Sequence, residues 1–130
     1  MRPEQARLLE MARRAADAAE RSIAADDAAT AANRAYYAML HSAQAALAGE
    51  GVEVRSHGAV HAAFGARFAK TRRLDPALHR WLLDAFDLRL LADYDPMWAL
   101  EAASIAETVE QAGRMIAIIE LFLAPRNELR

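Results

Sequence analysis

The sequence predicts an all-α domain of about five helices that ends in a long C-terminal helix. The 130 residues include only five glycines and four prolines, and alanine makes up roughly a quarter of the chain, which favours helix over strand. Long stretches contain no run of β-branched residues, and apolar residues recur at three- and four-residue steps. The length fits a single domain over residues 1–130.

The first two helices are predicted from apolar spacing and from their termini. The first covers residues 4–24, with an apolar stripe and a face of oppositely charged i,i+4 pairs. The second begins at Asp26 or Asp27, either of which can cap it, and ends at the glycine-rich turn 49–51. Its predicted core stripe consists of Tyr36, Leu40, Ala43 and Leu47.

The other three helices have equally clear boundaries. Ser56 caps a third helix that runs to about residue 71, and Asp75 followed by Pro76 begins a fourth that ends near residue 94. The fifth covers about 97–124 and ends before Pro125. Its apolar surface widens at Met115, Ile118 and Phe122, more than a small bundle covers, which predicts a homodimer.

Composition excludes several classes of function. The chain has no cysteine, which rules out disulfides, thiolate catalysis and cysteine-ligated metal sites. Its formal charge of −2 rules out a globally basic nucleic-acid binder, although not a local basic patch. No stretch approaches the roughly 20 apolar residues of a membrane span, and the charged N-terminus does not resemble a signal peptide. We therefore expect a cytoplasmic protein without membrane contact.

Arg89 lies on an unexpected face of the fourth helix. At about 100° per residue, Arg80, Asp84 and Asp87 share the solvated edge. Arg89 lies about 140° from Asp84, and Asp93 about 180° from it, so both point toward the apolar side. Burial of a lone charge would cost several kcal/mol, so Arg89 must be paired or must line a cleft. Two interpretations follow: an internal salt bridge to Asp93, or an arginine presented in a groove to bind phosphate.

Two other groups are candidate binding residues. The segment 55–73 has several cations and no carboxylate, which could attract RNA, a nucleotide or an acidic protein, or could form a solvated helix end. Its cations are Arg55, Arg67, Lys70, Arg72 and Arg73. On the second helix, Arg34 and His41 lie within about 20° of one another, with Tyr37 on the same edge, which predicts a groove or an interface.

The histidines do not predict a metal site. His57 and His61 have the i,i+4 spacing that lets two imidazoles share a metal, but no third carboxylate ligand accompanies them. His57 directly follows the Ser56 cap, where we expect it near the Arg89 groove, and His61 is expected to be structural. Neither a metal nor a cofactor is predicted.

Three strings together resemble a known family. They are NRAYYAMLHSAQAALAGEG at 33–51, RSHGAV at 55–60 and FDLRLLADYDP at 86–96. In this order, before a long last helix, they are similar to the small HEPN-domain proteins often encoded beside a minimal nucleotidyltransferase. The resemblance implies an up-and-down helical bundle that dimerises. It also implies either a metal-independent ribonuclease or a toxin that the nucleotidyltransferase holds inactive.

The resemblance assigns roles to individual residues. Arg89 matches the motif arginine, and with Asp93 and Tyr94 it forms the candidate catalytic group. In ribonuclease members a histidine follows after four to six residues, but here those positions hold Tyr94, Asp95 and Pro96, which places cleavage in doubt. In some modules the partner adds adenylate to a tyrosine near the motif, which makes Tyr94 the candidate modification site.

Three functions remain open from the sequence. The first is the HEPN member of a toxin–antitoxin-like pair that acts on RNA through Arg89. The second is a non-catalytic HEPN dimer that binds RNA, a nucleotide or the nucleotidyltransferase. The third is a structural helical adaptor in which Arg89 and Asp93 form an internal tie.

Overall fold

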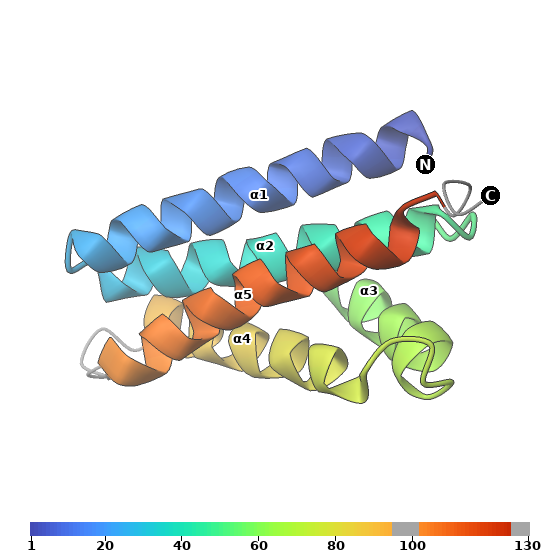
Figure 1. The fold of residues 1–130 in the computed structure, drawn as a ribbon. Coiled ribbons are helices and arrows are strands. Elements are labelled where there is room, and N and C mark those ends of the chain that lie inside the picture. Colours follow the sequence, from blue (N-terminus) through green and yellow to red (C-terminus); the bar gives the residue numbers. More distant parts are fainter. Residues whose placement is uncertain (95–101, 126–130) are drawn as a thin grey trace.

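The computed structural model describes residues 1–94 and 102–125, and within them the chain is a bundle of five α-helices without a strand (Figure 1). The long helices α1, α2, α4 and α5 alternate in direction, which confirms the predicted up-and-down bundle. A short π-helical segment, η1, continues α3. The elements are α1 (Pro3–Ala24), α2 (Ala28–Ala48), α3 (His57–Phe64), η1 (Gly65–Ala69), α4 (Pro76–Tyr94) and α5 (Ala102–Leu123).

Helix α2 lies at the centre and contacts each of the other four α-helices. The predicted stripe is buried, but so are residues on its other faces: 13 of the 21 residues of α2 are buried. Most of the additional buried residues are alanines, whose small side chains let neighbouring helices approach closely. The sequence therefore predicted one buried face where the structure has a helix buried nearly all round.

The predicted helix starts are confirmed. Asp27 accepts a hydrogen bond from the Thr30 amide (3.2 Å), and Ser56 accepts one from the Ala59 amide (3.3 Å). Helix α4 begins at Pro76, directly after Asp75. The Asp75 carboxylate accepts a hydrogen bond from the amide of Ala77, the second residue of the helix (2.9 Å). The predicted start of the fifth helix near residue 97 lies outside the described residues. Among the described residues, no helix is long and apolar enough to cross a membrane.

The third helix reaches nearly as far as predicted but changes its type. The Lys70 amide donates to the Gly65 carbonyl (2.8 Å), a π-helical hydrogen bond. At Gly65 the His79 ring of α4 comes so close that an added Cβ would lie 2.6 Å from its Nε2. The same Nε2 donates to the His61 carbonyl (3.0 Å). This contact joins α3 to α4 and positions the site described next.

Candidate functional site

Arg89 points toward the interior side of α4, as its helical position predicts. Its side chain is 19% exposed, whereas Asp84 and Asp87 on the opposite edge are exposed. Its guanidinium carbon lies 5.9 Å from the ring centre of Tyr36 and 5.5 Å from that of Tyr37. Two tyrosines of α2 therefore cover the cation, a favourable cation–π arrangement.

The pairing of Arg89 is incomplete. Its Nε lies 3.3 Å from an Asp93 carboxylate oxygen, an i,i+4 ion pair in which the Asp93 side chain is 36% exposed. The same Nε is buried and makes no hydrogen bond to any residue in the described part of the chain. The contact with Asp93 is therefore an ion pair without hydrogen-bond geometry, which leaves the Nε–H able to donate to a further acceptor.

An imidazole reaches the same place from α3. The His57 ring centre lies 5.5 Å from that of Tyr36, 5.7 Å from that of Tyr37 and 6.0 Å from that of Phe86. Helices α2, α3 and α4 thus each contribute to one group of residues, which we call the Arg89 cluster: Arg89, Tyr36, Tyr37, His57 and Phe86. The histidine of this cluster, His57, comes from α3 rather than from α4.

The electrostatics of the cluster keep His57 neutral. Burial lowers its pKa, and the neighbouring Arg89 guanidinium and His41 ring lower it further. Burial also raises the pKa of the Tyr36 phenol above its usual value. The cluster therefore places the Arg89 guanidinium beside an imidazole and a Tyr36 phenol whose pKa shifts both favour the neutral form.

His61 has the structural role predicted for it. It is buried, and its Nε2 lies 2.8 Å from the Tyr36 hydroxyl, which satisfies both groups. Its ring lies against Phe86, with ring centres 5.0 Å apart. Burial lowers the pKa of His61, and the neighbouring His57 and His79 lower it further.

Arg34 and His41 lie beside Tyr37 on α2, which confirms that the three share one edge. The Arg34 guanidinium carbon lies 5.2 Å from the Tyr37 ring centre, and its Nε donates to Asn33 (3.0 Å). The His41 ring centre lies 6.0 Å from that of Tyr37, and its Nδ1 lies 3.0 Å from the Gln44 side-chain oxygen. Both are partly buried.

Two predicted site residues lie apart from this arrangement. Tyr94, at the end of α4, is 78% exposed. Arg55 is exposed and lines a hollow of about 200 Å³ together with Glu4 and Arg7 of α1. Residues 1–94 and 102–125 form four described hollows, and Arg89 lines none of them. The predicted groove is therefore not among these hollows.

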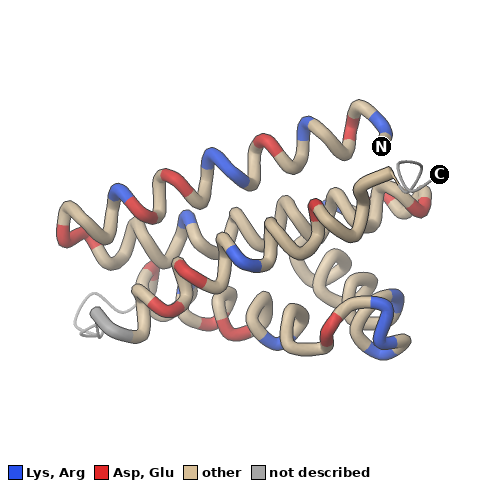
Figure 2. The backbone as a smooth tube through the Cα atoms, in the orientation of Figure 1, with Lys and Arg blue, Asp and Glu red and all other residues tan. Residues whose placement is uncertain are grey.

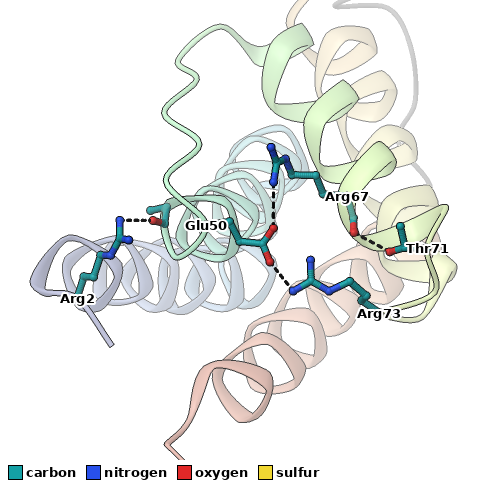
Figure 3. A network of polar contacts seen from close by, with 6 residues as sticks. Arg2, Glu50, Arg67, Thr71 and Arg73 are labelled. Carbon is teal, nitrogen blue, oxygen red and sulfur yellow. Dashed lines mark hydrogen bonds and ion pairs between the residues drawn. The ribbon is translucent and has the colours of Figure 1, made fainter.

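The basic segment 55–73 is partly neutralised, which the sequence did not predict. Figure 2 shows lysine and arginine gathered at the turn between η1 and α4, and Figure 3 shows how Glu50 lies between two of them. The Glu50 carboxylate pairs with Arg67 (3.2 Å) and with Arg73. Since Glu50 precedes the segment, the absence of carboxylates within 55–73 concealed this pairing. Lys70 and Arg72 make no ion pair with any described residue.

Sequence reasoning missed Phe86 and His79. Phe86 lies three residues before Arg89, a spacing that places both on one helix face and could have indicated a shared contact. His79 is half-buried and donates to the His61 carbonyl. The spacing of apolar residues along one helix does not predict where another helix crosses it, so the contact between His79 and Gly65 could not be predicted.

The cluster suits a particular chemistry. A guanidinium with an unused buried donor can bind a phosphate oxygen, and a neutral imidazole can accept a proton from a nearby hydroxyl. Within the described residues, no group of three histidine, aspartate or glutamate side chains is placed to hold a metal ion.

A family model and one relative match nearly the whole chain, and two further relatives match about two thirds of it. A family model described as the HEPN domain matches residues 5–129. A UPF0332 protein of Gloeobacter violaceus is 35% identical over 95% of this chain and 99% of its own length. A UPF0332 protein of Thermotoga maritima is 29% identical over 70% of this chain and 69% of its own. A Methanocaldococcus jannaschii protein named "Putative toxin MJ0142" is 30% identical over 68% of this chain and 60% of its own.

Proposed function

The chain belongs to the HEPN domain family, as the resemblance in its sequence indicated, and from this premise we propose that it binds RNA through the Arg89 cluster. We further propose that it acts as a homodimer in a two-protein module with a minimal nucleotidyltransferase. The sequence and the geometry support different parts of this proposal.

The buried Nε of Arg89 is the observation that carries RNA binding. It is a charged donor without a hydrogen bond in the described part of the chain, held beneath two tyrosine rings. A phosphate oxygen would satisfy it with a strong, charge-assisted hydrogen bond. The neutral His57 beside it can exchange a hydrogen bond with a ribose 2′-hydroxyl, which only RNA offers.

Tyr37 and its neighbours support recognition of a single-stranded nucleotide. The Tyr37 ring is half-buried near the cations of Arg34 and Arg89, which lie 5.2 Å and 5.5 Å from its centre. Unstacked bases bind to such tyrosine rings, while neighbouring arginines neutralise their phosphates. We propose binding without cleavage, because the motif position for a histidine holds Tyr94, Asp95 and Pro96.

The module is supported by the family and by one relative. The Methanocaldococcus protein carries the word toxin in its name, which supports a growth-slowing role for this chain when its partner is absent. Tyr94 is 78% exposed, so a partner enzyme can reach its hydroxyl. We propose that this oxygen attacks the α-phosphorus of ATP, loses its proton to solvent and releases pyrophosphate.

The end of α5 supports the homodimer. Met115 is buried within the chain, whereas Leu121 is 80% exposed and Phe122 lies beside it, also exposed. The apolar surface that was predicted to widen along α5 is thus buried at Met115 and exposed at Leu121 and Phe122. A second copy would bury the open part.

RNA binding is tested by fluorescence anisotropy with a labelled single-stranded RNA. We expect Arg89→Ala to weaken binding at least about tenfold, a loss of about 1.4 kcal/mol, and Arg89→Lys to restore little, since a lysine lacks the planar fork of donors. Arg14→Ala, which removes an exposed arginine of α1, is the matched control and should bind as the wild type does. Equal binding by Arg89→Ala and wild type would refute the proposal.

The same RNA, run on a denaturing gel, separates binding from cleavage. Cleavage that disappears in both Arg89→Ala and His57→Ala would extend the function to a ribonuclease that uses the α3 imidazole. Equal cleavage by wild type and both variants would indicate a contaminant.

A structural tie is the second candidate, favoured by the 3.3 Å ion pair between Arg89 and Asp93. It requires that Arg89→Ala lowers stability and leaves RNA binding unchanged. Binding and stability of one variant therefore separate the two functions.

A further inference from the structure

A hollow of about 580 Å³ lies between η1 and the first turns of α4, apart from the Arg89 cluster. Its walls come from two helices that meet at the contact between Gly65 and His79. We call it the basic hollow. It is the largest of the four described hollows.

The floor of the basic hollow is apolar. Ala66 and Ala69 of η1 contribute small side chains, and Leu83 of α4 is 37% exposed within it. An exposed leucine in a hollow of small residues offers apolar area that another molecule can bury.

The rim of the basic hollow is positively charged. Lys70, Arg72 and Arg80 line it, and all three are exposed. None of them forms an ion pair with a residue in the described ranges, in contrast to their neighbours Arg67 and Arg73, which pair with Glu50. No aspartate or glutamate lines the hollow. The rim therefore favours a negatively charged occupant.

The backbone at Arg72 is an independent observation. Its φ of 59° lies in the left-handed region, which glycine adopts without strain and arginine does not. A left-handed residue of this kind commonly closes a helix, and here it places the Arg72 cation beside the hollow.

We propose that the basic hollow docks an acidic amphipathic helix of a partner protein. The apolar stripe of such a helix would cover Leu83 and the alanine floor, and its flanking carboxylates would reach the three cations. A nucleic acid fits less well, because the described residues of the hollow include no phenylalanine, tyrosine or tryptophan on which a base could stack. Docking here does not depend on RNA binding at Arg89.

The test uses a defined probe, a fluorescein-labelled helical peptide about four turns long with leucines at i, i+3, i+4 and i+7 and glutamates beside them. A second peptide carries glutamine in place of every glutamate. We expect the wild-type chain to bind the glutamate peptide more tightly. Leu83→Glu should weaken that binding at least about tenfold, and Lys70→Glu about fivefold.

Leu91→Glu is the matched control, because Leu91 is also exposed on α4 but does not line the hollow; binding should stay within about twofold of wild type. Circular dichroism checks that each variant is folded. If Leu83→Glu unfolds, Lys70→Glu still tests the proposal, because it changes an exposed side chain. Arg89→Ala should bind the peptide normally, which separates this proposal from RNA binding.

Three results would overturn the docking proposal. The first is that the wild-type chain binds neither peptide. The second is that it binds the glutamine peptide as tightly as the glutamate peptide. The third is that Leu83→Glu and Leu91→Glu bind the glutamate peptide with equal affinity. If the glutamate peptide does not bind the wild-type chain, but an oligouridylate does and binds Lys70→Glu more weakly, the hollow would be assigned to nucleic acid.

Discussion

Replacing Arg89 by methionine separates a binding group from a structural tie. Methionine keeps an unbranched stem beneath the tyrosine rings but removes the guanidinium, including the buried Nε that makes no hydrogen bond among the described residues. If the guanidinium is held for a ligand, its loss leaves the unliganded fold about as stable as before. If it is a tie, its loss destabilises the fold.

The magnitudes favour a small net effect. The ion pair with Asp93, whose side chain is 36% exposed, is worth at most about 1 kcal/mol, and each tyrosine face adds about 0.5–1 kcal/mol. The buried Nε, which makes no hydrogen bond among the described residues, costs about 1–3 kcal/mol in the opposite direction. We therefore expect Arg89→Met to change the free energy of unfolding by less than about 1 kcal/mol, or about 3–5 °C in Tm.

The assay is urea unfolding followed by circular dichroism, for wild type, Arg89→Met, Asp93→Asn and the double variant. The coupling energy between the two positions should stay below about 0.5 kcal/mol, because the pair is partly solvated. Arg80→Met, on the exposed edge of the same helix, is the control and should change stability by no more than about 0.5 kcal/mol. A loss above about 2 kcal/mol in Arg89→Met, with coupling above about 1.5 kcal/mol, would refute the binding interpretation.

Two further predictions concern stability. Gly65→Ala should lower the free energy of unfolding by about 1–3 kcal/mol, because its Cβ would meet His79 at 2.6 Å. Gly58→Ala has open space around its Cβ and should raise the free energy of unfolding by about 0.4–1 kcal/mol. Thermal melts compare the two variants, and equal effects would contradict the close approach at Gly65. Burial lowers the pKa of His61, so the unfolded chain takes up the proton first as pH falls below about 6.5, and stability then falls by up to about 1.4 kcal/mol per pH unit. Urea titrations at successive pH values give the free energy of unfolding as a function of pH, and this free energy should fall less steeply with falling pH in His61→Gln. The same pH dependence in His61→Gln and wild type would exclude His61 as the cause.

Local signals predicted most of the helix boundaries. Asp27, Ser56 and the Asp75-Pro76 pair mark helix starts through interactions within a few residues, so no knowledge of the rest of the chain is needed. The orientation of Arg89 follows from helical periodicity in the same way, because residues on one helix hold fixed angles to one another.

Contacts between helices could not be predicted from those signals. Glu50 pairs with Arg67 and Arg73 across a loop and a turn, and no spacing rule joins residues that far apart. The π-helical hydrogen bond from the Lys70 amide to the Gly65 carbonyl likewise follows from no apolar spacing in the sequence. The sequence therefore predicted an unbroken helix and an unpaired basic segment.

The Arg89 cluster depends both on the periodicity of one helix and on contacts between helices. The helical angle of Arg89 was predictable, but its meeting with His57 depends on how α3 is placed against α4. That placement is held by the His79 hydrogen bond to the His61 carbonyl, one turn after His57. Since α3 carries His57 at its first turn and His61 at its second, any change that moves α3 at Gly65 also moves the imidazole relative to the guanidinium. The position of His57 beside Arg89 therefore depends on the approach of α3 to α4 at Gly65, a contact that no spacing along α4 reveals.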